Sequence, residues 1–352
     1  MPDRILVTGG AGFVGSAVCL ALQKTFPQAI VVAFDNLIRA GSELNPPRLA
    51  EAGVRFVRGD VRKPEDLAAI GMDPDLIVEC SAEPSAQAGY GGGSPTYLVE
   101  TNLFGCFHCL ELARRTKADF IFVSTSRVYP FRALNGLPYR EAATRFEVTG
   151  EWASGISESF PLEGARSLYG MTKLSAEYMV REFADAYGFR AIVNRCGLLT
   201  GPWQMAKADQ GVIALWAAAH VFGRPLKYIG FGGTGKQVRD FLHVADFCDL
   251  LLEQIARFDV FAAEPCWNVG GGLLYSLSLL ETTAVCEEVT GDQIAFTPDT
   301  VDRPADVRVY VSDCRKLFAQ TQWRPQRDAQ RTVSDIVEWL RANEALLRGI
   351  LD

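Results

Sequence analysis

Residue types that bind structural metals are few and poorly arranged in this chain. It has three histidines, and its nine cysteines show no regular spacing. Cys106 and Cys109 form the only close CxxC pair, in a segment whose pattern is typical of a helix. Because neither a second CxxC pair nor paired histidines accompany it, we expect no metal site. We interpret the cysteines as buried, reduced thiols of a cytosolic protein.

An excess of basic charge and long apolar runs are also lacking. Lysine and arginine number 35 against 42 acidic residues, so the formal net charge is −7. A nucleic-acid surface needs a basic face, so we expect no nucleic-acid partner. No apolar run reaches the ~18–20 residues of a membrane span, and no charged-then-apolar signal segment precedes the strand-like run Arg4-Ile5-Leu6-Val7. These absences predict a soluble, cytoplasmic protein without a membrane partner.

The first two-thirds of the chain alternates apolar runs with helical patterns. Val14, Val18 and Leu22 are spaced by four, which predicts an amphipathic helix after the first run. The predicted strands are Ile5–Val7, Ile30–Phe34, Arg55–Val57, Leu76–Val78, Phe120–Ser124 and Ala191–Asn194. They are continuous apolar runs, as in strands buried on both faces of a parallel sheet. The alternation therefore predicts an α/β fold with right-handed crossovers.

A glycine-rich turn joins the first predicted strand to the first predicted helix. Gly9 permits the tight turn, Gly12 lets the backbone approach a pyrophosphate, and Gly15 lets the helix pack close to the strand. The helix N-terminus offers free N–H groups and a positive dipole end to phosphates. Such glycines can serve sterics alone, but a strand before and a helix after favour dinucleotide binding.

Two acids follow at the ends of the second and third predicted strands. Asp35 lies about 20 residues beyond the turn, where a carboxylate binds the ribose hydroxyls of NAD. It would repel the extra phosphate of NADP, although Arg39 lies nearby. Asp60 is placed to reach the adenine amino group, or it is a helix N-cap or turn aspartate. The pattern favours NAD as the cofactor.

The composition of the sequence changes after about residue 197, where glycine and proline become frequent. We predict a Rossmann-type doubly wound parallel sheet over 1–196, to which 238–268 returns. A smaller α/β substrate-binding lobe would take 197–237 and 269–352, with a last helix over Val333–Leu347. A ligand would then bind in a cleft between the two parts.

A tyrosine and a lysine stand four residues apart in Tyr169-Gly170-Met171-Thr172-Lys173. On a helix the two side chains share one face. A fixed ammonium favours the phenolate form of a nearby phenol, and a phenolate can take a hydroxyl proton while hydride leaves the carbon. This spacing also occurs on solvated helix faces, but together with the glycine turn it indicates a catalytic pair.

Hydroxyl side chains end the predicted strand Phe120–Ser124, in Ser124-Thr125-Ser126. Open parallel sheets bind ligands at the carboxyl ends of their strands. Thr125 is therefore a candidate to hydrogen-bond the hydroxyl on which Tyr169 acts. The alternative is that these residues only cap the end of the strand.

Together these residues resemble the extended short-chain dehydrogenase/reductase family, whose members include nucleotide-sugar epimerases, dehydratases and decarboxylases. The likeness covers nearly the whole chain. It is carried by Gly9–Gly15, Asp35-Asn36, Asp60, Asn102, Ser124-Thr125, Tyr169…Lys173, Arg195…Gly201, Gly235-Lys236-Gln237-Val238-Arg239-Asp240 and Arg303-Pro304-Ala305-Asp306. The chain departs from the family at Glu79-Cys80-Ser81-Ala82, where His-Leu-Ala-Ala is frequent.

The resemblance implies roles for individual residues. Thr125, Tyr169 and Lys173 would form the catalytic set, and Asn102 and Ser124 would line the nicotinamide half of the cofactor site. Arg239 and Arg303 would grip the substrate diphosphate with charged forks, unless each forms a surface ion pair. The other implied cofactor-binding residues are Phe13, Val14, Asn36, Val61, Ser81 and Ala82, and the other implied substrate-binding residues are Ser126, Arg127, Gln210, Gln237 and Arg308.

The residues after Thr125 narrow the reaction. The family's dehydratases continue with an Asp-Glu pair that eliminates water, whereas Ser126 and Arg127 follow here. The stretches that instead resemble epimerases of CDP-linked deoxysugars are 35–41, 56–60, Asp209-Gln210-Gly211, 235–240, 276–281, 308–313 and the insert 131–167. The implied reaction inverts C2 through transient oxidation, with NAD tightly bound and not consumed.

Other functions remain open. The resemblance implies a nucleotide-diphosphate sugar as the partner, with a CDP-sugar favoured, and a UDP-hexose or UDP-uronate inverted at C4 is the alternative. Relatives that act as NAD(P)-binding sensors typically lack the tyrosine or lysine. The resemblance also implies a homodimer, or a homotetramer, through helices near 98–115 and 174–187. Phe104, Phe107 and Leu110 would serve that face or belong to the core.

Overall fold

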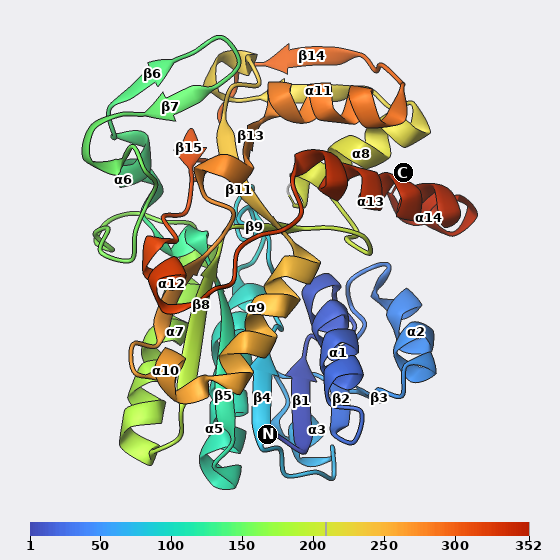
Figure 1. Cartoon of the computed structure of the whole chain (residues 1–352), viewed down its shortest axis with the longest axis vertical. Coiled ribbons are helices and arrows are strands. Elements are labelled where there is room, and N and C mark those ends of the chain that lie inside the picture. The colour runs from blue at the N-terminus through green and yellow to red at the C-terminus, as the bar shows by residue number, and fades with distance from the viewer. Residues whose placement is uncertain (208–209, 352) are drawn as a thin grey trace. The chain divides into compact units, whose positions relative to one another are not determined.

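Seven strands form the main sheet of the computed structural model, which describes residues 1–207 and 210–351 (Figure 1). The strand order is β12-β8-β5-β4-β1-β2-β3. The bounds are β1 Arg4–Thr8, β2 Ile30–Asp35, β3 Arg55–Arg58, β4 Leu76–Glu79, β5 Asp119–Thr125, β8 Ala191–Cys196 and β12 Cys266–Val269. The β1–β2, β1–β4, β2–β3 and β4–β5 pairs are parallel. The order reverses direction at β1, so the predicted Rossmann-type doubly wound sheet is confirmed.

All six predicted strands occur in this sheet. β1, β2, β4 and β8 are buried over most or all of their length, which explains why their apolar runs do not alternate. The edge strand β3 is only half-buried. The seventh strand, β12, was not predicted, because its short run Cys266–Val269 gains its partner from a distant part of the chain.

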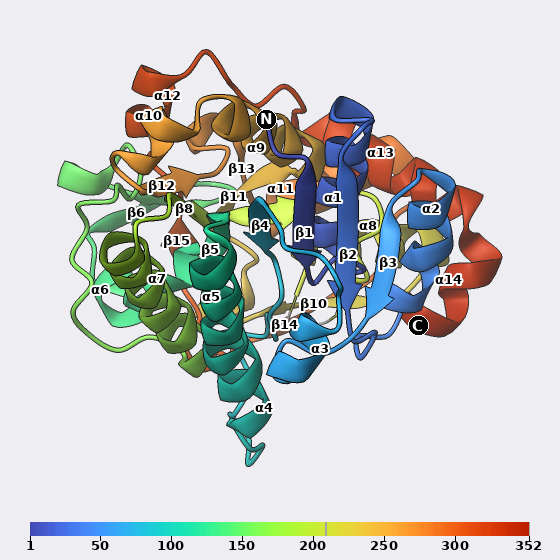
Figure 2. The same cartoon turned by 90° about the horizontal axis from the view of Figure 1, so that it is seen from below.

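Helices cover both faces of the sheet (Figure 2), with α1 and α9 on one side and α5 and α7 on the other. The bounds of the helical elements here are α1 Phe13–Thr25, η1 Ser42–Leu44, α2 Asn45–Glu51, α3 Pro64–Ala68, α4 Thr96–Val99, η2 Glu100–Phe104, α5 Gly105–Thr116, η3 Ser126–Val128, α7 Leu168–Tyr187, α9 Val244–Ala256 and α10 Phe258–Ala262. Val18 and Leu22 are buried on α1, as predicted. Cys106 and Cys109 lie on α5 and belong to the hydrophobic core that α5 and α7 share with the sheet. Burial raises the pKa of both thiols well above its usual value.

The chain divides into two compact units. One comprises 1–128, 168–195 and 247–267, and the other comprises 129–167, 196–246 and 268–352. Whether these units correspond to a cofactor domain and a substrate lobe stays a prediction. Asp209, from one stretch quoted for the resemblance, lies outside the described residues.

The second unit contains short strands and helices. Its elements are α6 Phe131–Asn135, β6 Tyr139–Glu141, β7 Phe146–Val148, η4 Gly150–Trp152, β9 Leu198–Thr200, α8 Val212–Phe222, β10 Leu226–Ile229, η5 Phe231–Gly233, β11 Val238–His243, η6 Leu273–Tyr275, β13 Ser276–Ser278, α11 Leu279–Thr290, β14 Phe296–Asp299, β15 Val309–Tyr310, α12 Arg315–Gln320, α13 Ala329–Ala342 and α14 Glu344–Leu351. β11 is its central strand, since it pairs with β9, β13 and β15.

The prediction of one helix over Val333–Leu347 was wrong. The structure has α13 and α14, separated at Asn343. The backbone N–H of Asn343 and its side-chain amide both donate to the carbonyl of Trp339. This local bonding ends the first helix. Across the described part of the chain, no helix is long and apolar enough to cross a membrane.

Candidate cofactor and catalytic site

The glycine turn between β1 and α1 is shaped by close backbone contacts. Gly9 has φ +62°, and the N–H of Gly12 donates to its carbonyl at 2.9 Å. A Cβ on Gly15 would lie 2.1 Å from the carbonyl oxygen of Gly9, which leaves no room for a side chain. Phe13 and Val14 begin α1 directly after the turn. Backbone thus lines the start of the helix, an arrangement that fits the pyrophosphate of a dinucleotide.

Asp35, at the end of β2, stands beside this turn. Its carboxylate accepts hydrogen bonds from the backbone N–H of Ala11 at 3.1 Å and of Leu37 at 2.8 Å. Burial raises the pKa of Asp35, and these backbone donors offset part of the effect. The acid therefore links the glycine turn to the segment after β2, where the sequence analysis expects the ribose.

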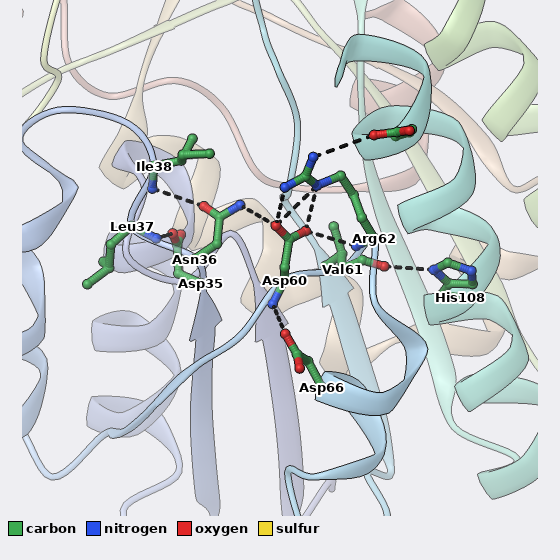
Figure 3. Close-up of polar contacts among 10 residues, drawn as sticks. Asp35, Asn36, Leu37, Ile38, Asp60, Val61, Arg62, Asp66 and His108 are labelled. Carbon is green, nitrogen blue, oxygen red and sulfur yellow. Dashed lines mark hydrogen bonds and ion pairs between the residues drawn. The ribbon is translucent and has the colours of Figure 1, made fainter. Parts of the chain in front are cut away.

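Asp60 is the centre of a polar network beyond β3 (Figure 3). Its carboxylate accepts a hydrogen bond from the Asn36 side-chain amide at 3.1 Å. It also accepts hydrogen bonds from the Arg62 guanidinium, the shortest of which is 2.7 Å. The Arg62 N–H also donates to it, so Asp60 forms the turn that the sequence analysis weighed as an alternative. Arg62 additionally lies 4.8 Å from the centre of the Tyr97 ring. The proposed contact of Asp60 with adenine stays a prediction.

Replacing Asp60 with asparagine is expected to lower the free energy of unfolding by about 1 kcal/mol at neutral pH, after allowance for solvent screening. Burial raises the pKa of Asp60, but hydrogen bonds from Arg62 and Asn36 outweigh it and hold the pKa at about 2, below its usual 3.8. A carboxyl with a lowered folded pKa stabilises the fold above its unfolded pKa, and that contribution is lost as the pH falls through about 2.

Urea unfolding of the parent and Asp60→Asn at several pH values checks this expectation. The difference in stability should be largest at neutral pH and should shrink between about pH 4 and pH 2. A difference that stays constant over that range would contradict the assignment of this stabilisation to the ionised carboxyl.

The segment after β4 is joined to η2 and α7 by hydrogen bonds of one asparagine. The Asn102 side chain accepts from the N–H of Glu83 at 2.7 Å and donates to the carbonyl of Glu83 and to the Thr172 hydroxyl. Asn102 therefore ties the segment after β4 to α7. Its predicted place at the nicotinamide is not tested by these contacts. Ala82 is half-buried in this segment.

Val61 and Ser81 have packing and hydrogen-bonding roles in the structure. The Val61 side chain is buried against Gly105, and its carbonyl lies 2.8 Å from Nδ1 of His108 (Figure 3). The Ser81 hydroxyl donates to the carboxyl of Glu79. Both residues belong to the same edge of the sheet as the glycine turn, and their contact with a cofactor stays a prediction.

The predicted catalytic residues all belong to one compact unit. Tyr169 and Lys173 lie one turn apart on α7, and this helix packs against β5 and η3, at whose junction Thr125 lies. Ser124 donates to the buried Glu177, which also forms an ion pair with Arg195 at 2.7 Å. This buried pair fixes α7 against β5 and β8. Thr125 thus ends β5 at the carboxyl edge of the parallel sheet, and the helix that carries Tyr169 and Lys173 packs against this strand.

The predicted substrate residues fall into two groups. Ser126 and Arg127 lie in η3, in the unit of the catalytic residues, and the others lie in the second unit. There, Arg239 forms an ion pair with Asp306 at 2.8 Å, so two stretches quoted for the family resemblance meet. The backbone carbonyl of Arg303 accepts a hydrogen bond from the backbone N–H of Asp306.

The remaining predicted substrate residues have local partners in the second unit. The Gln237 amide donates to the carbonyl of Ile229 at 2.9 Å. The Arg308 guanidinium lies 4.1 Å from the Tyr139 ring centre. Gln210 forms a backbone bridge with Lys207. These contacts do not test substrate binding.

Arg62 and Glu177 were not singled out from the sequence, and Glu79 was named only in a stretch that departs from the family. Arg62 follows Asp60 by two residues, and its backbone N–H donates to the Asp60 carboxylate. Aspartate often forms a turn in this way, so the spacing could have indicated the contact. Glu177 gave no such signal, because its partner Arg195 lies on another element. Glu79 stands out in the sequence as an acid ending an otherwise apolar strand.

The residues considered for a dimer face differ in their exposure to solvent. Phe104 and Phe107 are 52% and 39% exposed, whereas Leu110 is fully buried in the core. Tyr178 and Tyr187 on α7 are exposed as well. Exposed aromatic side chains are thus present on both helices, and the oligomeric state stays a prediction.

Comparisons with known proteins agree with this geometry. The family model described as "NAD dependent epimerase/dehydratase family" matches residues 5–270. CDP-paratose 2-epimerase of Salmonella typhi is 30% identical over 96% of this chain and 98% of its own length. A dTDP-glucose 4,6-dehydratase of Salmonella typhimurium is 27% identical over 99% and 95%.

A solved structure is also similar. The UDP-glucose 4-epimerase of Thermus thermophilus, in complex with NAD, matches with a TM-score of 0.78 and 26% identity, over 96% of this chain and 99% of that one. Because the family model spans most of the chain and a relative covering nearly all of it is 30% identical, this chain belongs to the NAD dependent epimerase/dehydratase family.

Proposed function

We propose that this protein is an isomerase, a nucleotide-sugar epimerase that inverts C2 of a CDP-linked deoxysugar and converts CDP-paratose to CDP-tyvelose. The observation that carries the proposal is the group at the carboxyl end of β5. Tyr169 and Lys173 share one face of α7, which packs there. The residues after Thr125 are Ser126 and Arg127, so no acid pair follows to eliminate water.

The chain's own residues account for the proton transfers. Tyr169, as phenolate, accepts the proton of the C2 hydroxyl and returns it after inversion. Lys173 favours the phenolate by its positive charge, and the Thr125 hydroxyl orients the sugar hydroxyl. NAD, which the Gly9–Gly15 turn, Asp35 and Asn36 would hold, would supply the hydride acceptor and donor that inversion at C2 requires. Each cycle would regenerate NAD, so the cofactor need not be released and would stay tightly bound.

The choice of C2 and of a CDP-sugar rests on similarity to the Salmonella typhi epimerase and on chemistry. Paratose lacks a 3-hydroxyl, so a ketone at C4 would be too far from C2 to acidify its proton. Direct oxidation at C2 is the simpler route. Arg239 and Arg303 are proposed to bind the diphosphate, and the Asp306 carboxylate would orient Arg239 through their ion pair.

Incubation with CDP-paratose is expected to give CDP-tyvelose, identified by nuclear magnetic resonance of the sugar. In deuterated water the product should keep protium at C2, because the hydride that leaves is the one that returns. UDP-glucose and UDP-glucuronate serve as matched controls, for which turnover should be at least about a hundredfold slower.

Three results would overturn parts of the proposal. Deuterium at C2 would reject direct hydride return. Faster turnover of a UDP-sugar, with inversion at C4, would favour the function of the Thermus relative. Release of no dinucleotide from the denatured, purified protein would reject a tightly held cofactor. The protein is further proposed to act as a homodimer through α5 and α7, where Phe107 and Tyr187 are exposed.

A further inference from the structure

Glu79 is a buried acid that the proposed reaction does not use. It ends β4 and is 1% exposed. Its neighbours across the sheet are Thr8 on β1 and Phe122 on β5. Residues paired in register on parallel strands point to the same face, and Phe122 belongs to the core under α5 and α7. The Glu79 carboxyl therefore faces these two helices.

Lys173 lies over the same part of the sheet. Its side chain is 2% exposed, and its ammonium lies 3.9 Å from the centre of the Phe122 ring. Phe122 and Glu79 are neighbours on adjacent strands, which are separated by about 4.8 Å. Burial raises the pKa of Glu79, and the positive charge of Lys173 opposes that effect. The two buried charges thus act on one another.

The hydroxyl and thiol groups beside Glu79 are neutral at physiological pH. The Ser81 hydroxyl donates to Oε1 of Glu79, and the side chains of Ser81 and Thr8 both favour its ionised form. From α5, Cys106 and Cys109 face the acid, and burial raises the pKa of both thiols well above its usual value. Thr8 and Phe122, on the flanking strands, do not titrate. Lys173 is therefore the cation that offsets the buried carboxylate.

We propose that Glu79 is a positioning residue whose carboxylate holds the Lys173 ammonium over Phe122 and limits how strongly that charge acts on Tyr169. The inference rests on the proposed function, since it takes Tyr169 and Lys173 as the reacting pair. If the negative charge is removed, the acid that remains one turn from Lys173 on α7 is Glu177, which is paired with Arg195. The ammonium is then less compensated and favours the phenolate more strongly. Tyr169 then ionises at lower pH.

The test follows the ionisation of Tyr169 in the protein with its natural cofactor content. The ultraviolet difference between each protein and its Tyr169→Phe counterpart reports the phenolate during a pH titration, without any sugar. In Glu79→Gln the midpoint is expected to fall by about one pH unit. The rising limb of kcat against pH should shift equally, with KM changed less than about twofold.

Two further variants separate charge from structure. Glu79→Asp keeps a carboxylate and is expected to keep the midpoint near that of the parent. Asp75→Asn makes the same carboxyl-to-amide change just before the other end of β4, where Asp75 pairs with the half-exposed Arg4. It should not move the midpoint. An unchanged midpoint in Glu79→Gln would overturn the inference, as would the same shift in Asp75→Asn.

If Glu79→Gln does not fold, infrared spectroscopy of Lys173→Met gives a second test. Without the ammonium, burial should protonate Glu79, so a carboxylic acid band absent from the parent should appear. Its absence would also overturn the inference. A shifted midpoint without turnover of CDP-paratose would reject the proposed substrate and keep this role of Glu79. Turnover with an unshifted midpoint would reject the role of Glu79 alone.

Discussion

Replacement of Tyr169 with phenylalanine is expected to lower kcat about a thousandfold, within the range that general acid–base groups contribute. The variant keeps the ring, which is almost buried on α7, and removes only the oxygen that would exchange the proton. The fold and the bound dinucleotide should therefore remain. Steady-state turnover of the nucleotide sugar measures the effect.

Tyr178 provides the matched control for this change. It lies on the same helix but is 50% exposed, so Tyr178→Phe removes an equivalent hydroxyl away from the site. Its kcat should stay within about twofold of the parent. Activity retained in Tyr169→Phe would reject the assignment of the catalytic pair. Loss of the dinucleotide from that variant would show that the phenol mainly supports cofactor binding.

Substitution of Gly15 by alanine is expected to weaken NAD binding about a hundredfold and to lower the thermal midpoint of unfolding, since overpacking costs about 1–3 kcal/mol or more. The added Cβ would lie 2.1 Å from the Gly9 carbonyl oxygen and 2.9 Å from the Gly10 Cα, both of which are backbone atoms. The glycine turn must therefore move away from the helix. Dinucleotide released per protein molecule and calorimetry measure the two effects.

Two other glycines separate local packing from the cofactor role. Gly349 lies in α14 with no atom within 4 Å of an added Cβ, so Gly349→Ala should leave NAD binding unchanged and should not lower the thermal midpoint. In Gly12→Ala the Cβ would meet only the Gly9 carbonyl oxygen, at 3.1 Å, so the fold should survive. Binding of NAD should still weaken if the pyrophosphate approaches there. Normal NAD content in Gly15→Ala would contradict the proposed phosphate site.

Local patterns were the reliable part of the sequence. Six strands were predicted because parallel strands buried on both faces require unbroken apolar runs, which a sequence displays directly. The end of α13 was missed for an equally local reason. Asn343 interrupts a pattern that otherwise continues, and its side chain competes for the carbonyl of Trp339.

Burial on one helix shows a limit of such patterns. Phe107 and Leu110 are three residues apart on α5, yet the first is exposed and the second is fully buried. Both are apolar, so composition cannot distinguish them. The orientation of the helix on the sheet decides which one reaches the core.

The sequence by itself determined the parallel α/β fold, the glycine turn and the placement of Tyr169 and Lys173 one turn apart on one helix, because each depends on spacing within one strand, turn or helix. Only the tertiary structure decided which charges meet. Glu177 reaches Arg195, Arg239 reaches Asp306, and Glu79 comes under the influence of Lys173 across elements far apart in the chain. Coulomb interactions depend on distance and burial, and a sequence contains neither until the chain has folded.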